Sequence, residues 1–305
     1  MITKLLIEQH FHGAYGVDFN KATVSDVLDL ASKIKKDGVG GIFPTLVTDT
    51  VENTKKQIKV IKDAAQKQKE GAKILGVHLE GIFLNPEKKG IHNPMHFLAP
   101  TIDNFKKIAD DFIKIVTLAP ELCRAYIKNG QNLITYLKGK GVKVQAGHCV
   151  GADLSGCDGV THMFNAMSGI NHHSKSTALS ALIDDNIYTE IIADGVHVND
   201  DTLKLLFKSK PEDKILLISD SLPCTRSNIS NFVFADEKVF FDGERATSAK
   251  GTLAGSTKLL PDIVKILGQK GMFNPKYVDN SYNYHKINID GKIEWDKDFN
   301  VVSVK

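Results

Sequence analysis

The stretch GVHLEGIFLNPEKKGIHNP, residues 76–94, joins an apolar strand pattern to a long polar loop. Its apolar positions, Val77 and Leu79, continue a run that is typical of a buried strand. Glu80 stands at the carboxyl end of that strand, and Gly81 lets the backbone turn away. An isolated buried carboxylate is costly and is normally paired, protonated or bound to a metal, so we expect Glu80 to bind a metal ion.

Outward from this stretch, short apolar runs and longer helical patterns alternate along the chain. The predicted strands cover residues 5–8, 41–46, 74–79, 115–118, 142–146, 160–163, 188–193 and 215–219. The predicted helices cover residues 24–36, 51–69, 103–112, 121–138, 151–154, 176–184, 200–208 and 257–270. This alternation is typical of an α/β fold, the (β/α)8 TIM-type barrel, whose active site lies at the C-terminal ends of the strands.

The expected domain organisation is one barrel and a short tail. We assign residues 1–275 to the barrel. Residues 276–305 are predicted to form a short β-rich tail, because KINID, KIEWD and NVVSV alternate in polarity like three strands.

The composition excludes several classes of protein. The 305 residues include 39 basic and 36 acidic side chains, a near balance that argues against a nucleic-acid-binding surface. No apolar run approaches the roughly 18 to 20 residues of a membrane span. Four cysteines without paired spacing indicate reduced thiols. These features predict a soluble, cytoplasmic protein with no nucleic-acid or membrane partner.

Ligand-type side chains follow or open most of the predicted strands. These residues are His10, His12, Glu80, His148, His162, Asp194, His197 and Asp220. Strand ends converge on one cavity in a barrel, and packing does not require polar side chains there. Imidazole and carboxylate groups suit Zn²⁺ and also Fe²⁺, Mn²⁺ or Co²⁺, so the pattern predicts a metal centre.

A series of motifs runs in order through residues 2–260: HLEG with KGIHNP, VTLAPE, AGH at 146–148, THMFNAM, IIADGVH, SD at 219–220 and GTLAGS. The series resembles the N-acetylglucosamine-6-phosphate deacetylase family of the amidohydrolase superfamily. The resemblance implies a metal-dependent barrel, usually a homodimer, that removes the acetyl group from an amino-sugar phosphate.

The resemblance also implies residue roles. Glu80, His148 and His162 would hold the principal metal ion, with Zn²⁺ preferred over Fe²⁺, Mn²⁺ or Co²⁺. His10 and His12 match the histidine pair of the superfamily, which makes a second ion possible. Asp220 would be the proton shuttle and His197 would polarise the acetyl carbonyl while contacting the substrate. The other substrate-contacting positions are His92, Asn165, Ala166, His173, Leu253 and Ala254.

The chain departs from the family pattern in two places. It begins almost at the first histidine pair, without the N-terminal strands of a small β-sandwich, so the tail would be the remnant of that domain. The family's usual arginine after FNAM is also absent, and the sequence there is HHSKS, residues 172–176. His173, Lys175 or Arg226 would then have to replace an arginine's two-pronged contact with phosphate.

Three functions stay open at this stage. The favoured one is deacetylation of an N-acetyl amino-sugar phosphate. The second is an amidohydrolase acting on a different N-acyl or cyclic amide, which the missing arginine favours. The third is a catalytically degenerate binding protein, against which the complete set of ligand positions and Asp220 argues.

Overall fold

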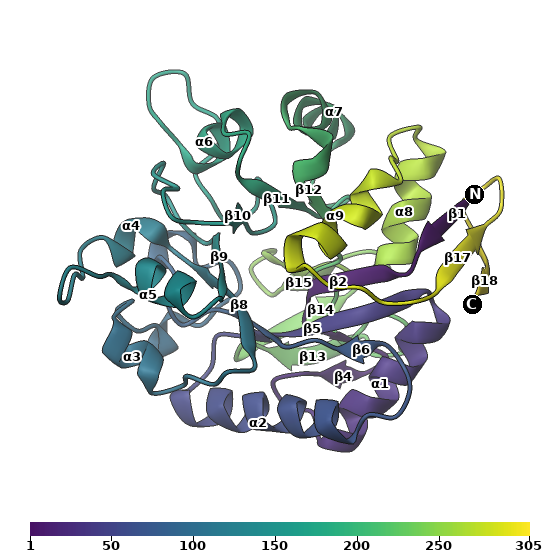
Figure 1. The fold of residues 1–305 in the computed structure, drawn as a ribbon, viewed down its shortest axis with the longest axis horizontal. Coiled ribbons are helices and arrows are strands. Elements are labelled where there is room, and N and C mark those ends of the chain that lie inside the picture. The colour runs from purple at the N-terminus through teal and green to yellow at the C-terminus, as the bar shows by residue number, and fades with distance from the viewer.

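A computed structural model describes residues 1–305, and its centre is a parallel β-barrel (Figure 1). The eight barrel strands lie in sequence order around the sheet: β2 (Leu6–Phe11), β5 (Val39–Val47), β7 (Val77–Glu80), β8 (Ile113–Leu118), β9 (Lys143–Ala146), β10 (Gly159–Val160), β11 (Tyr188–Ile191) and β12 (Ile215–Leu217). The short β6 (Lys73–Ile74) also pairs with β5. The backbone N–H of Asp220 donates to the carbonyl of His10 at 2.9 Å, and the backbone N–H of His12 donates to the carbonyl of Ser221 at 2.9 Å. These two hydrogen bonds join the end of the last strand to the first and close the barrel. The predicted (β/α)8 fold class is confirmed.

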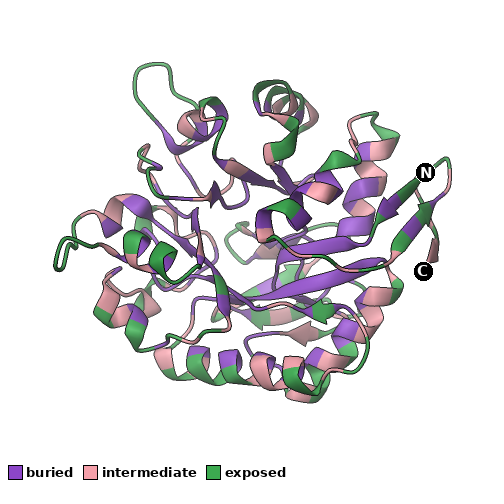
Figure 2. Cartoon of the chain, in the orientation of Figure 1, coloured by how far each residue is buried: buried purple, intermediate pink, exposed green.

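Amphipathic helices surround the barrel and turn their apolar faces towards it, as Figure 2 shows by burial. They are α1 (Val24–Lys36), α2 (Val51–Lys67), α3 (Ile102–Lys106), α4 (Pro120–Cys123), α5 (Leu133–Gly139), α6 (Thr177–Ile183), α7 (Asp200–Ser209) and α8 (Leu260–Gln269). In α1 the buried side chains recur at helical spacing, and Thr23 with Asp26 forms a capping box that fixes its start. The bounds of α1 are those predicted.

Three predicted helices differ from the observed ones. The helix expected at 121–138 is two helices, α4 and α5, because the chain turns between them through Asn129 and Gly130 at positive φ (52° and 74°). Residues 151–154 form no helix. Helix α3 ends at Lys106, well before the predicted residue 112.

The tail differs from the prediction of three strands. Helix α9 (Lys276–His285) covers the N-terminal end of the barrel, where Asn280 donates to the carbonyl of Ile215 at 2.8 Å and Tyr282 to that of Leu5 at 2.8 Å. KINID is not a strand. The three-stranded sheet consists of β17 (Lys292–Trp295), β18 (Val301–Val304) and the N-terminal β1 (Ile2–Lys4), which brings the two termini together (Figure 1).

A second small sheet lies between β12 and α8 and was not predicted. Its antiparallel strands are β13 (Asn231–Phe234), β14 (Glu237–Phe241), β15 (Ala246–Ser248) and β16 (Leu253–Gly255). Its inner face forms a separate apolar cluster with Val47 and Leu222, which adjoin the C-terminal ends of β5 and β12. The small sheet therefore covers the end of the barrel at which the predicted ligands lie.

Short elements complete the fold: β3 (Gly13–Ala14), β4 (Val17–Asp18), and the 3₁₀ turns η1 (Pro86–Lys88), η2 (Pro94–His96) and η3 (Glu212–Lys214). None of the helices has the length and apolar character that crossing a bilayer requires.

Candidate active site

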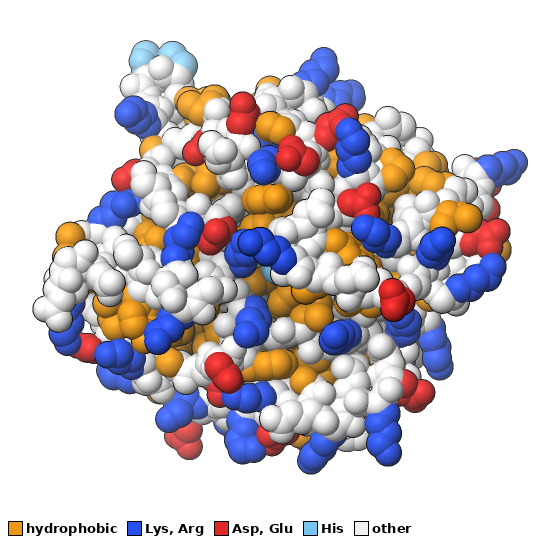
Figure 3. Space-filling view, viewed as in Figure 1, with side chains coloured by type: hydrophobic (Ala, Val, Ile, Leu, Met, Phe, Trp, Pro, Cys, Tyr) orange, Lys and Arg blue, Asp and Glu red, His pale blue; other side chains and the backbone are white.

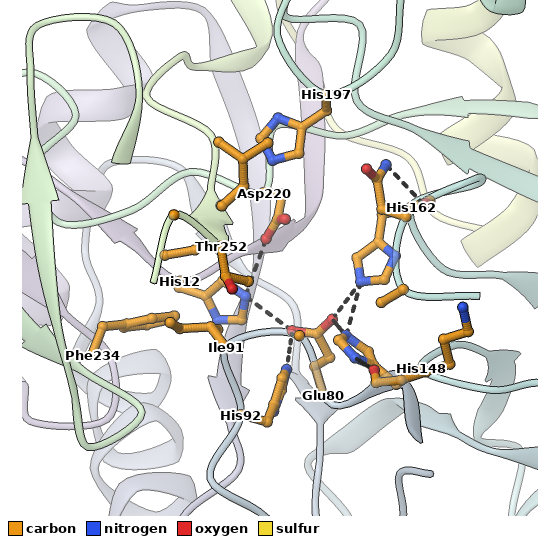
Figure 4. Close-up of a pocket in the computed structure, with 18 of the residues that line it drawn as sticks. His12, Glu80, Ile91, His92, His148, His162, His197, Asp220, Phe234 and Thr252 are labelled. Carbon is orange, nitrogen blue, oxygen red and sulfur yellow. Dashed lines mark hydrogen bonds and ion pairs between the residues drawn. The ribbon is translucent and has the colours of Figure 1, made fainter. Parts of the chain in front are cut away.

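A cavity of about 450 Å³ opens at the C-terminal ends of the barrel strands (Figure 4). Most of the predicted site residues line it, together with several that were not predicted. The lining residues are His12, Glu80, Glu87, Lys88, Gly90, Ile91, His92, His148, His162, Asn165, Ala166, His197, Asp220, Phe234, Gly251, Thr252, Leu253, Ala254 and Gly255.

Glu80 occupies the centre of this site and is 2% exposed. One carboxylate oxygen, Oε1, lies 2.9 Å from His162 Nε2 and 3.2 Å from His148 Nε2, and those two nitrogens are 3.1 Å apart. The other, Oε2, lies near three further imidazoles: 3.0 Å from His12, 3.3 Å from His10 and 3.7 Å from His92. The fold thus brings together the residues that the sequence placed at separate strand ends.

Asp220 contacts the same pair of histidines as Glu80. Its Oδ1 lies 3.2 Å from His12 Nε2 and 3.5 Å from His10 Nε2. Hydrogen bonds on both sides of the residue fix its backbone, with the N–H donating to His10 and the carbonyl accepting from Ser256 at 2.8 Å. The side chain is therefore held beside the metal-ligand candidates and faces the cavity.

Several of these residues have a left-handed backbone just beyond their strands. The φ angles are 48° at His148, 30° at His162 and 53° at Asp220. Such conformations cost about 1–3 kcal/mol each in non-glycine residues and persist where surrounding contacts over-determine them. These three residues lie beyond the ends of β9, β10 and β12 and line the cavity, whereas Glu80 is the last residue of β7.

The donor set fits a divalent cation. Two groups of three buried ligand-type residues have their ligand atoms within 4.8 Å of one another, His10 with His12 and Asp220, and Glu80 with His92 and His148. The Nε2 atom of His10 is buried and has no hydrogen-bond partner, although both carboxylates lie close to it. Imidazole nitrogens and carboxylate oxygens that converge in this way are the ligands expected of Zn²⁺ or a similar ion.

Electrostatics supports the same conclusion. Burial lowers the pKa of His12, but its hydrogen bonds and ion pairs with Asp220 and Glu80 outweigh burial and raise that pKa to about 9. Burial acts oppositely on Glu80, yet the surrounding histidines hold the pKa of this carboxyl well below its usual range. The two carboxylates thus strongly favour positive charge among the imidazoles. Protons on the histidines supply that charge when no metal is bound, and a bound cation would supply it in their place.

His197 is oriented by Asp194. Its Nδ1 donates to Asp194 Oδ2 at 2.8 Å, while Oδ1 accepts the backbone N–H groups of Val196 and His197 at 2.9 Å. Burial lowers the pKa of His197, but the hydrogen bond with Asp194 outweighs it and raises the pKa. His197 therefore presents its other nitrogen, Nε2, to the cavity that it lines.

His92, predicted to contact the sugar, lies beside the metal-ligand candidates Glu80 and His148. Its ring packs edge-on against that of His148, with centroids 4.5 Å apart. The backbone N–H of Thr48 donates to its Nδ1 at 3.4 Å, and the Thr48 hydroxyl lies 2.8 Å from the same atom. Because Nδ1 accepts, the proton of the neutral ring belongs on Nε2, which faces Glu80 and the cavity.

The remaining predicted substrate residues divide into two groups. Asn165, Ala166, Leu253 and Ala254 line the cavity. His173 does not: it lies with His172 on the exposed loop before α6, where Figure 3 shows histidine side chains at a projecting tip. Arg226 is also elsewhere, paired with Asp262 at 2.7 Å.

Glu190, on β11, is a functional candidate that the sequence analysis missed. This carboxylate is fully buried beneath the site and lies 3.0 Å from His10 Nδ1. It also accepts from Gln9 at 2.6 Å and Gln145 at 2.9 Å. Its contact with Nδ1 places the proton of His10 on that atom and leaves Nε2 as a ligand. An acid inside the otherwise apolar run YTEIIA was the available signal.

A (β/α)8 barrel with histidines and carboxylates gathered at its C-terminal strand ends is the architecture of the amidohydrolase superfamily. No model of a protein family matches the chain. It is 33% identical over 263 residues to N-acetylgalactosamine-6-phosphate deacetylase of Escherichia coli O157:H7, covering 82% of this chain and 68% of that one. The chain belongs to the family of N-acetyl amino-sugar 6-phosphate deacetylases.

Two other relatives agree with this assignment. N-acetylglucosamine-6-phosphate deacetylase of Bacillus subtilis is 32% identical over 265 residues, which cover 82% of this chain and 65% of that protein. The chain thus spans slightly less than two thirds of that relative. The crystal structure of N-acetylglucosamine-6-phosphate deacetylase from Pasteurella multocida superposes with a TM-score of 0.88 at 26% identity, covering 100% of this chain and 84% of that one.

Proposed function

We propose that the protein is a metal-dependent hydrolase that removes the acetyl group from N-acetylglucosamine 6-phosphate, or a closely related N-acetyl amino sugar, to give the free amine and acetate. One observation carries the proposal: Glu80 lies among five imidazoles and, with Asp220, lines the cavity at the C-terminal ends of the barrel strands. Membership of the deacetylase family supplies the reaction class.

Glu80, His148 and His162 would hold the principal ion, which we expect to be Zn²⁺, with Fe²⁺, Mn²⁺ or Co²⁺ as alternatives. His10 and His12 would hold a second ion, with Asp220 within reach of both histidines. When bound, such a metal lowers the pKa of its water to about 7 and polarises a carbonyl oxygen.

Asp220 is the proposed proton carrier. Burial raises the pKa of its carboxyl, but the charges of His10 and His12 outweigh burial and lower it, so the group is ionised at neutral pH. It can accept a proton from water at the floor of the cavity and later give it to the departing amine nitrogen. Water thereby adds across the amide: its oxygen goes to acetate and its protons to acetate and the amine.

His197 and His92 are the proposed hydrogen-bond donors to the acetyl carbonyl. Each has its Nδ1 engaged within the protein, His197 with Asp194 and His92 with Thr48, which turns Nε2 towards the cavity. In His92 this nitrogen carries the proton of the neutral ring, and in His197 it donates in the imidazolium form that Asp194 favours. Donors fixed in advance stabilise the charge that develops on the oxygen in the transition state. Leu253 and Ala254, on β16, line the same cavity and offer apolar contact to the acetyl methyl group.

The sugar has two candidates, because the relatives named above include deacetylases of both N-acetylglucosamine and N-acetylgalactosamine 6-phosphates. Acetate release from these two sugars and from their unphosphorylated forms, measured on metal-loaded protein, tests the proposal. We expect acetate from at least one 6-phosphate. Metal-loaded protein that releases none would favour a different N-acyl substrate or a binding role.

We further propose that the protein works as a cytoplasmic homodimer. The four cysteines are unpaired and buried, which agrees with a reducing compartment. The mass of the protein in solution, by light scattering, should be twice that of the 33.5 kDa chain, and a monomeric mass would refute the dimer.

A further inference from the structure

The cavity contains one permanent cation. Three carboxylates line it, those of Glu80, Glu87 and Asp220, while Lys88 is the only lysine or arginine among its lining residues. A substrate that carries a phosphate dianion needs positive charge where that group binds, because moving an unpaired charge out of water costs free energy. We propose that the ammonium group of Lys88 binds the phosphate of the substrate and takes the place of the family's missing arginine. This inference rests on the proposed function.

The basic residues that the sequence suggested for this task lie elsewhere. Arg226 is paired with Asp262. His173 and Lys175 lie on the exposed loop before α6 and do not line the cavity. Lys89, next to Lys88, donates to the carbonyl of Gly90 at 3.2 Å and is also absent from the lining.

The backbone of Lys88 is fixed against the metal-ligand candidates. Its carbonyl lies 2.8 Å from Nδ1 of His148, which donates to it. Lys88 ends the turn η1, whose start is capped by the side chain of Asn85. The next turn passes close to the same histidine, since a Cβ on Gly90, at φ 56°, would lie 3.1 Å from His148 Cε1. Lys88 therefore starts from a defined position at the cavity wall.

The side chain of Lys88 is free to bind a ligand. Its ammonium group has no ion pair or hydrogen bond in the structure, whereas lysines elsewhere in the molecule, such as Lys62 and Lys270, are paired with carboxylates. It is half-buried, whereas the neighbouring Glu87 is exposed. A lysine in this setting offers a mobile point charge and three donors, which suits a phosphate monoester without the fixed two-pronged geometry of arginine.

The same backbone contact makes the residue suitable for substitution. The carbonyl that holds His148 remains in every variant, so a change of side chain removes the charge and leaves the histidine contact intact. K88M keeps most of the length of the side chain, K88R keeps the charge, and K89M removes a neighbouring charge that does not line the cavity.

The test measures kcat/KM for N-acetylglucosamine 6-phosphate and for N-acetylglucosamine with each metal-loaded variant. Because a hydrogen bond to a charged group is worth about ten- to a hundredfold in affinity, K88M should lose about that factor on the phosphorylated sugar. On the free sugar it should change less than about threefold, since no charged contact is lost there. K88R and K89M should stay within about fivefold of the parent on both sugars.

Binding provides a readout that does not depend on turnover. Titration calorimetry with glucosamine 6-phosphate and with glucosamine should show that K88M weakens only the phosphorylated ligand. If the parent binds glucosamine 6-phosphate through Lys88 but releases no acetate, the deacetylase proposal fails and the phosphate site stands. If acetate is released and K88M affects both sugars equally, or neither, the assignment of Lys88 is overturned while deacetylation stands.

Discussion

Asp194 and His197 form a pair whose strength depends on pH. Burial raises the pKa of Asp194, but its contacts with His197 and two backbone N–H groups outweigh burial and lower it from 3.8 to about 2. The pKa of His197 is raised above 6.5 by the same pair. The stabilisation is therefore complete between pH 3.8 and 6.5, fades as pH falls towards 2, and fades again as pH rises through the raised pKa of His197.

We predict that Asp194→Asn lowers the free energy of unfolding by about 2 kcal/mol near pH 5, and by less at pH 3 and pH 9. Urea denaturation of both proteins at the three pH values measures this difference. A loss that stays constant across pH would mean that Asp194 acts only through hydrogen bonds that asparagine cannot make.

The sequence was a better guide to the side chains that line the cavity than to the buried side chains that support them. Glu80, His148 and His162 were identifiable because ligand-type groups at strand ends have no packing reason to be there. Glu190 was not, since its partners Gln9 and His10 are about 180 positions away in sequence and meet it only inside the closed barrel.

The loop that follows β7 depends on Glu121, at the start of α4. The Oε1 atom of Glu121 accepts from Asn85 Nδ2 at 2.9 Å and from the backbone N–H of Val150 at 2.8 Å. The loop is also held to the segment after β9, because the N–H of Asn85 donates to the carbonyl of His148 at 2.9 Å. One carboxylate thus joins the loop that carries Lys88 and His92 to the segment that follows a metal-ligand candidate.

We predict that Glu121→Ala raises KM about tenfold and changes kcat less, because two donors lose their acceptor and the loop is no longer held. Glu121→Gln keeps an acceptor oxygen in place and should remain within about threefold of the parent. Steady-state kinetics of the two variants decides this. If KM rises equally in both variants, the negative charge of Glu121 matters and its role in holding the loop does not.

Elements whose pattern is periodic were predicted well, and those that depend on turns were not. Helix α1 was located because its apolar positions and its cap agree. The hairpin of β13 and β14 was missed, although NFVF and EKVFF are joined by two residues, Ala235 and Asp236, both at positive φ (49° and 64°), as in a type I′ turn. Alanine at such a position gives no sequence signal, since asparagine and glycine are the usual residues there.

The molecule as a whole is closed by contacts between its two ends. Strand β1 pairs antiparallel with β17, and the indole N–H of Trp295 donates to the hydroxyl of Thr3 at 2.9 Å. Trp295 is 2% exposed and belongs to the main apolar core. No local pattern predicts this pairing, because the partners are about 290 positions apart in sequence.

We predict that Trp295→Ala lowers the free energy of unfolding by about 3–5 kcal/mol through the cavity it leaves. Trp295→Phe retains most of the apolar volume and loses one hydrogen bond, so its cost should be nearer 1 kcal/mol. Chemical denaturation followed by circular dichroism, which does not require the tryptophan, measures both. A cost below about 1 kcal/mol for the alanine variant would show that the terminal sheet contributes little to the stability of the barrel.

Substitution of Asp220 by Asn tests the proposed deacetylase mechanism through two measurements on the same sample. They are the bound metal, by elemental analysis, and the rate of acetate release from the 6-phosphorylated sugar. We predict that the variant retains the metal, since Glu80, His148 and His162 are unchanged, while kcat falls by orders of magnitude because the proton carrier is lost. Near-normal turnover with metal bound would contradict this mechanism.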